Sequence, residues 1–190
     1  VVALPAVVYA RDALPAGRRS AALAALTAAF VLAMAGLVAA RDVTSFLVCW
    51  ELMTLIPAAA MLVARQDEEV RRAVIVYVGI THVGAVGVWA AMLILSSHGA
   101  IGGAPLGPGG LQTLVLVMAL VGFLTKAGIV PLHVWLPRAH PVAPSHISAL
   151  MSGVMIMLAL YGLIRVLVLW LTGIPTWTGV VLVVLGSLSA

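Results

Sequence analysis

A single glutamate, Glu51, interrupts a long apolar segment of the sequence. The segment runs from residue 43 to residue 64, and Glu51 is its one charged side chain. On an ideal helix this carboxylate lies about 12 Å from the nearer end, too deep for the side chain to reach water. A carboxylate at such depth costs several kcal/mol unless it is paired, hydrated or protonated, so Glu51 indicates an ion or proton site. The alternative is a permanently protonated Glu51 that is hydrogen-bonded to Thr54.

The sequence contains one lysine, Lys126, at the end of a second apolar segment that begins at residue 111. Gly128 and Pro131 follow it and interrupt the helix. Irregular backbone at membrane depth survives only where protein or a water-filled cavity satisfies its polar groups. A buried lysine can load and release a proton when a carboxylate or water approaches, so the pattern indicates an ion path. The alternative is a lysine that snorkels to the cytoplasmic interface.

Histidine supplies the other titratable chemistry, because imidazole titrates near neutrality. His82, His133 and His146 lie in or close to apolar segments, and we predict that they relay protons. A hydrogen-bonded structural role is the alternative for each of them. His140 lies between His133 and His146, but these spacings match no metal-site pattern, and the single cysteine, Cys49, excludes both a disulfide framework and a cysteine-based zinc site. We expect neither a metal nor a bound cofactor.

The composition decides the class of protein that must position these side chains. Of the 190 residues, 64% are hydrophobic and 8% are charged, and the mean hydropathy is +1.22. A soluble domain carries roughly 25% charged residues, so a soluble fold is excluded. A β-barrel would alternate polar and apolar residues, so the chain is predicted to be a polytopic α-helical membrane protein in contact with the lipid bilayer. In a membrane protein, a net charge of +4 reflects the arginines that orient the chain in the bilayer. We therefore expect no nucleic acid partner.

The apolar segments predict an all-α bundle of about six transmembrane helices, one of them broken. We treat residues 1–190 as a single transmembrane domain. Four prolines between residues 131 and 144 predict a short half-helix and a turn, with Ser145 as the N-cap of the next helix. Pro57 predicts a kink and leaves a carbonyl near residue 53 without its helical donor. The predicted helices cover 20–40, 43–64, 73–96, 111–127 with a broken continuation, 145–171, and the chain from 178 onward.

Arginines fall almost entirely on one side of the predicted bundle. The other side receives only Arg41, so the positive-inside rule places the N-terminal end in the cytoplasm and the Ser97–Gly110 loop outside. We expect an internal fragment of a longer protein, because the chain begins at Val1 and ends in an apolar stretch at Ala190. The arginines on the predicted cytoplasmic side are Arg11, Arg18, Arg19, Arg65, Arg71, Arg72 and Arg138.

Several motifs together resemble the antiporter-like membrane subunits of the respiratory complex I superfamily. They are Trp50-Glu51-Leu52-Met53, the stretch from Lys126 to Pro137, and Ser148-Ala-Leu. Residues 138–155 and Thr81-His82-Val-Gly84 are most similar to the large membrane subunit of hydrogenase-4 and formate hydrogenlyase complexes. The resemblance covers nearly the whole chain. It implies a fragment of a subunit of about fourteen helices, mainly the first of two inverted repeats.

The resemblance also implies roles for the two buried charges. Glu51 and Lys126 would form a proton half-channel, in which contact and separation of the pair drive proton transfer. The subunit would translocate protons without a redox centre or catalytic residue of its own, driven by electron transfer in other membrane and peripheral subunits of a respiratory or hydrogenase complex. Its place would be the inner (cytoplasmic) membrane. Met157 stands where many relatives carry a relay lysine, and the second repeat lies outside this sequence.

Two other functions remain open from the sequence. One is a subunit of a multi-subunit cation/proton antiporter, which would share Glu51 and Lys126 and could carry either H⁺ or Na⁺. The other is a membrane assembly subunit that transports nothing. Met157 favours the assembly role, whereas the retention of both Glu51 and Lys126 argues against it.

Overall fold

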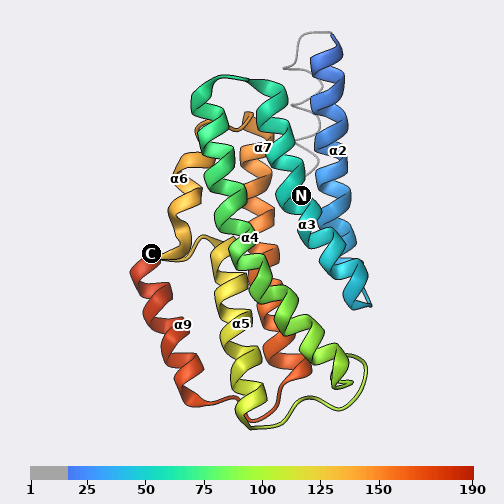
Figure 1. The fold of residues 1–190 in the computed structure, drawn as a ribbon, viewed down its shortest axis with the longest axis vertical. Helices are drawn as coiled ribbons and strands as arrows, with labels where there is room; N and C mark the ends of the chain where they lie inside the picture. Colours follow the sequence, from blue (N-terminus) through green and yellow to red (C-terminus); the bar gives the residue numbers. More distant parts are fainter. Residues whose placement is uncertain (1–16) are drawn as a thin grey trace. The chain divides into compact units, whose positions relative to one another are not determined.

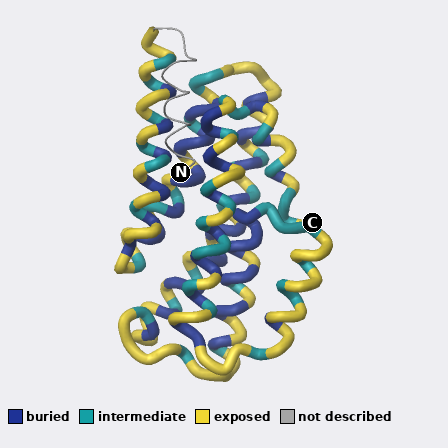
Figure 2. The backbone as a smooth tube through the Cα atoms, turned by 180° about the vertical axis from the view of Figure 1, so that it is seen from behind, coloured by how far each residue is buried: buried dark blue, intermediate teal, exposed yellow. Residues whose placement is uncertain are grey.

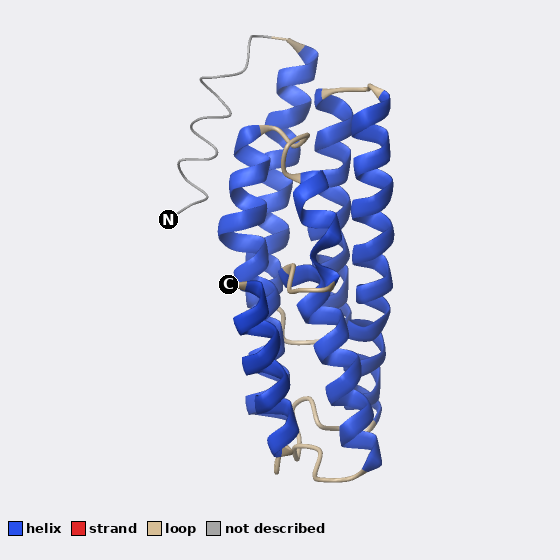
Figure 3. Cartoon of the chain, turned by 90° about the vertical axis from the view of Figure 1, so that its left-hand side faces the viewer, coloured by secondary structure: helices blue, strands red, loops and turns tan. Residues whose placement is uncertain are grey.

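A computed structural model describes residues 17–190, which form helices joined by loops (Figure 3). Five helical stretches in this part of the chain are long and apolar enough to cross a membrane: 18–39, 43–64, 68–97, 110–139 and 145–170. The predicted all-α membrane fold is therefore confirmed. Arg11 lies outside the described residues. The helices are α2 (Arg18–Ala39), α3 (Val43–Ala64), α4 (Glu68–Ser97), α5 (Gly110–Ala127), α6 (Leu136–Ala139), α7 (Ser145–Leu150), α8 (Ile156–Arg165) and α9 (Thr176–Ser189).

Helix starts show where the predicted boundaries hold and where they fail. α3 begins and ends as predicted, because Asp42 caps it by accepting a hydrogen bond from the Ser45 amide at 2.8 Å. α4 begins at Glu68 rather than at residue 73, because Asp67 accepts from the Val70 amide at 3.0 Å and acidic residues occupy the first turn. Ser145 is the first residue of α7, so its prediction as an N-cap is wrong; Pro144 takes that position.

Contacts divide the chain into two compact units. Within the described residues, unit one comprises 17–79 and Trp135–Leu158, and unit two comprises Ile80–Val134 and Ala159–Ala190. α4 contributes its first part to unit one and its second part to unit two. The prediction of a single transmembrane domain over residues 1–190 stays a prediction.

In unit one, α2 and α3 lie side by side (Figure 1). Their approach is close at Gly36, where an added β-carbon would stand 2.7 Å from the sulfur of Cys49. Phe30, Leu37 and Trp50 are buried in this unit. Small residues between two apolar helices allow such contact, which stabilises helix pairs in a membrane.

In unit two, the ends of two loops are joined by backbone hydrogen bonds. The Leu106 amide donates to the Trp170 carbonyl at 2.9 Å, and the Thr172 amide donates to the Leu106 carbonyl at 3.0 Å. The buried side chain of Gln112, near the start of α5, donates to the Thr172 carbonyl. These bonds hold the loop before α5 against the segment that follows Trp170.

The helix predicted over 145–171 contains two π-helical turns, Met151–Met155 and Val166–Trp170. Each π turn holds an extra residue, so its backbone hydrogen bonds depart from the regular spacing of an α-helix. The broken continuation after α5 is confirmed as a 3₁₀ turn, Leu132–Trp135, followed by α6.

Buried and exposed positions are interspersed along the long helices, whereas α9 is buried only at Thr178 (Figure 2). Large apolar side chains are among the most exposed: Val83 of α4 is 72% exposed and Leu32 of α2 is 71% exposed. Such residues are typical of helix faces that meet lipid or further helices, because neither requires a polar surface.

Candidate functional site

Glu51 lies within the 22-residue helix α3, beside side chains that are almost completely buried. Trp50, Met53 and Thr54 are each at most 1% exposed, whereas Glu51 is half-buried. Glu51 therefore lies at the border between the packed face and the outer face of α3, and its Oε2 atom is buried. The alternative hydrogen bond to Thr54 stays a prediction.

The kink residue of α3, Pro57, lies six positions beyond Glu51. Proline has no N–H, so the carbonyl of Met53, four residues earlier, lacks its helical donor. The hydroxyl of Tyr77 on α4 donates to this Met53 oxygen at 3.4 Å, and the bond is buried. The sequence predicted the free carbonyl near residue 53, and the structure shows which side chain satisfies it.

Tyr77 is itself completely buried in unit one and has further contacts there. Its ring lies 5.2 Å from the ring of Trp135, at 48°, an arrangement that aromatic pairs favour. Its hydroxyl also lies 4.0 Å from the sulfur of Met155, in the first π turn. One side chain thus contacts α3, the broken helix and the π turn.

Lys126 lies in the last turn of α5 and is only 1% exposed. α5 ends at Ala127, and Gly128 follows as its C-cap with a φ of 70°, the left-handed conformation that glycine adopts without strain. The Ile129 amide then donates to the Leu124 carbonyl at 3.1 Å. A cation at a helix C-terminus interacts favourably with the helix dipole, and the broken backbone that follows is the predicted one.

The residue before Lys126, Thr125, packs against the second part of α4 in unit two. Its hydroxyl donates to the Val121 carbonyl at 2.6 Å. Gly84 of α4 lies directly against its side chain, and Gly122 of α5 approaches the backbone of α4 in the same way. Glycines on both helices therefore let α4 and α5 approach closely beside the buried lysine.

The predicted relay histidines differ in their surroundings. His146 lies on α7 and is 3% exposed. His82 on α4 and His133 in the 3₁₀ turn are half-buried, and Nδ1 of His133 is a buried atom without a hydrogen-bond partner within residues 17–190. Glu51 and His146 belong to unit one, while Lys126, His82 and His133 belong to unit two. The pairing of Glu51 with Lys126 and the proton relay stay predictions.

One hydrogen-bonded histidine was absent from the predicted site. Nδ1 of His140 lies 2.7 Å from the hydroxyl oxygen of Ser148, and both residues belong to unit one. Burial lowers the pKa of the His140 imidazole from its usual value of 6.5. The sequence placed His140 among the prolines, but its spacing carried no sign of the Ser148 contact.

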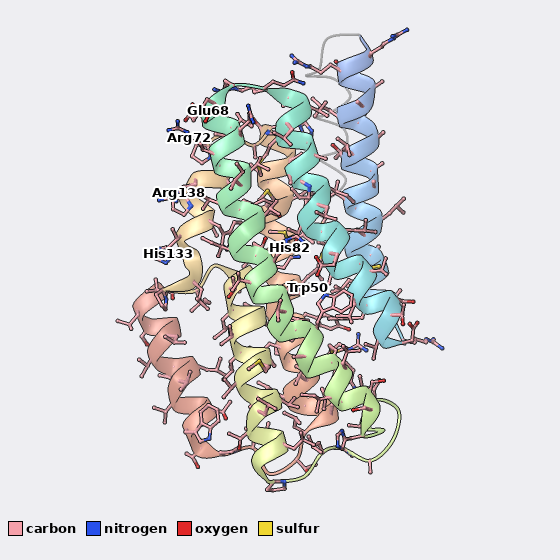
Figure 4. All side chains as sticks on the ribbon, in the orientation of Figure 1. Trp50, Glu68, Arg72, His82, His133 and Arg138 are labelled. Carbon is pink, nitrogen blue, oxygen red and sulfur yellow. The ribbon has the colours of Figure 1, made fainter. Side chains whose placement is uncertain are left out.

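One end of the helices in unit one carries a group of charged residues. Figure 4 shows Glu68, Arg72 and Arg138 together there, and Arg72 pairs with Glu68 at 3.0 Å. Arg65 pairs with Asp67 at 2.8 Å in the same turn between α3 and α4. These exposed pairs contribute little to stability, but they keep this end of the unit polar, as an interface with water requires. Within residues 17–190, no three histidine, cysteine or acidic side chains group as metal ligands.

Residues 40–190 match the family described as "NADH:quinone oxidoreductase/Mrp antiporter, TM". Hydrogenase-4 component B of Escherichia coli (strain K12) is 38% identical over 182 residues, which cover 92% of this chain and 27% of that protein. NAD(P)H-quinone oxidoreductase chain 4 1 of a Picosynechococcus species is 31% identical over 150 residues, 75% of this chain and 28% of that protein. Formate hydrogenlyase subunit 3 of E. coli (strain K12) is 40% identical over 78 residues, 40% of this chain and 12% of that protein. The chain thus spans about a quarter of the length of the first two relatives.

Proposed function

This chain belongs to the NADH:quinone oxidoreductase/Mrp antiporter transmembrane family, and we propose that it carries part of a proton path through a multi-subunit membrane complex. It is a multi-pass membrane protein, with five stretches that can span a bilayer. The complex is a redox-driven one of the NADH:quinone oxidoreductase or hydrogenase-4 kind. Electron transfer occurs in partner subunits, and this chain contributes no redox centre.

The observation that carries the proposal is the burial of Lys126. An ammonium that is 1% exposed, in the last turn of an 18-residue apolar helix, would be expensive without a function. The break at Gly128 provides irregular backbone beside it, which membranes tolerate where water or protein supplies hydrogen bonds.

In the proposed mechanism, Glu51 controls the protonation of Lys126. An ionised carboxylate close to the lysine favours the charged ammonium, and its removal or neutralisation favours release of the proton. His82, His133 and His146 pass protons to and from the pair. Met157, on α8, cannot hold a proton, so water or His146 bridges the relay in its place.

The proposed orientation follows from the arginines. The end of unit one that holds Arg65, Arg72 and Arg138 faces the cytoplasm, and the Ser97–Gly110 loop faces outward across the inner membrane. The partners are the other membrane subunits and the peripheral subunits of the complex.

The experiment measures proton uptake by vesicles that contain the full-length subunit in its complex. Glu51→Gln and Lys126→Ala should each strongly reduce pumping per electron transferred, while the complex stays assembled. Glu69→Gln is the matched control, because the Glu69 side chain is 72% exposed and pairs only at the surface with Arg65. Parental pumping by both variants would contradict the proposal.

The family description also covers Mrp antiporters, which favours a cation/proton antiporter as the second candidate. The two candidates differ in what drives the protons. Pumping that depends on an electron donor supports the redox-driven complex, whereas proton movement driven by a sodium gradient without a donor supports the antiporter. A non-transporting assembly subunit would show neither, and its loss would only lower the amount of complex.

A further inference from the structure

We propose that Tyr77 is a positioning residue for Glu51, because its hydroxyl replaces the backbone donor that Pro57 removes from α3. The inference rests on the proposed function of Glu51. It assigns to Tyr77 a role that hydropathy and charge do not reveal.

The first step is the missing donor. Within a regular helix, the amide of residue 57 would donate to the carbonyl of residue 53, and proline cannot do so. Met53 is completely buried, so its carbonyl has no access to water from this side. A buried carbonyl without a donor is costly in a membrane protein. The Tyr77 hydroxyl stands 3.4 Å from the Met53 oxygen and satisfies it.

The second step is the direction of the bond. A phenolic hydroxyl has one proton to donate. The Met155 sulfur is also within reach of the Tyr77 hydroxyl, but at 4.0 Å and as a weaker acceptor. The proton therefore goes to the Met53 carbonyl, and the sulfur completes the packing around the oxygen.

The third step links the bond to Glu51. Glu51 and Met53 lie in the same turn of α3, just before Pro57. A bond that fixes the Met53 carbonyl therefore fixes the bend of α3 next to the carboxylate. The Tyr77 ring is held in turn by Trp135, which closes the 3₁₀ turn nine residues after Lys126 along the chain. Tyr77 thus contacts both the turn of α3 that contains Glu51 and the 3₁₀ turn that follows α5 along the chain.

The test uses Tyr77→Phe in the full-length subunit within its complex, since phenylalanine keeps the ring and removes only the hydroxyl. We expect pumping to fall several-fold and its pH midpoint to shift, with assembly unchanged. Tyr161→Phe is the matched control, because Tyr161 is half-buried and offers its ring, rather than its hydroxyl, to Arg165.

The decisive measurement repeats Tyr77→Phe in a Pro57→Ala background. Alanine restores an amide donor to the Met53 carbonyl, so the loss of the Tyr77 hydroxyl should then have little further effect on pumping or on the thermal midpoint of the complex. Equal losses in both backgrounds, or parental pumping by Tyr77→Phe, would overturn the inference.

The Glu51→Gln variant separates this inference from the proposed function. If Glu51→Gln pumps normally, the proposed function of Glu51 fails, while the thermal coupling of Tyr77 and Pro57 still tests the bond to Met53. If Glu51→Gln stops pumping and Tyr77→Phe does not, only the positioning role fails.

Discussion

Gly84 of α4 lies so close to Thr125 of α5 that a β-carbon at position 84 would stand 2.6 Å from the Thr125 β-carbon. Real β-carbons essentially never approach this closely, so an alanine at position 84 must push the two helices apart. Thr125 directly precedes Lys126, and any shift there moves the buried lysine. The packing of α4 against α5 at this contact therefore helps to determine the position of Lys126.

We therefore predict that Gly84→Ala destabilises the protein by about 1–3 kcal/mol, the usual cost of overpacking. The control is Gly79→Ala on the same helix, where an added β-carbon meets nothing within 4 Å. That variant should be neutral or slightly stabilising, because alanine favours a helix over glycine. Thermal unfolding of the purified subunit in detergent measures both. Equal midpoints for the two variants would contradict the packing argument.

The burial of His140 predicts a dependence of stability on pH. Burial lowers the His140 pKa from 6.5, so the unfolded chain binds the proton more readily than the folded one. The stabilisation is complete above pH 6.5 and is lost as the pH falls from 6.5 through the lower folded pKa. His140→Gln should remove part of this loss, measured as the thermal midpoint between pH 7.5 and pH 5. Equal pH profiles for His140→Gln and the parent would contradict the prediction.

The membrane orientation predicts a labelling pattern. In a Cys49→Ala background, a cysteine at Gly107 should react with an impermeant maleimide added from outside, and a cysteine at Gln66 should not. Both positions are exposed, so a difference in labelling reports the side of the membrane. Permeabilised cells provide the control, in which both positions should react. Labelling of position 66 alone in intact cells would reverse the proposed topology.

The pairing of Glu51 with Lys126 predicts a short cross-link. Cysteines at both positions in the Cys49→Ala background should be joined by a bifunctional reagent whose span matches a salt bridge. Opposite charges that are buried apart each bear the cost of desolvation, and pairing offsets part of both. A second pair, at Glu69 and Lys126, should stay unlinked. If neither pair forms a link, direct pairing is wrong and the switch mechanism loses its basis.

Hydropathy predicted the parts of the fold that the membrane itself determines. α3 and the break after α5 follow from apolar length and from glycine and proline, which act locally. The start of α4 was missed because its first turn carries Glu68 and Glu69, and hydropathy does not distinguish a charged helical turn from a loop.

The parts of the site that the sequence did not predict depend on contacts between distant residues. Pro57 reveals a carbonyl without a donor, but Tyr77 lies 24 residues beyond Met53 and nothing local connects them. The π turns were missed for a different reason. In a helix that is apolar all round, one extra residue leaves no break in the periodic pattern.

The π turn at Met151–Met155 changes how this helix can vary in length. Deleting a residue from a regular α-helix rotates everything beyond it by about 100° and turns its packed face away from its neighbours. Deleting one from the π turn instead converts that turn to a regular one, and the residues on both sides keep their directions. The turn is thus a place where homologous chains can differ by one residue while α7 and the start of α8 keep the same packed faces.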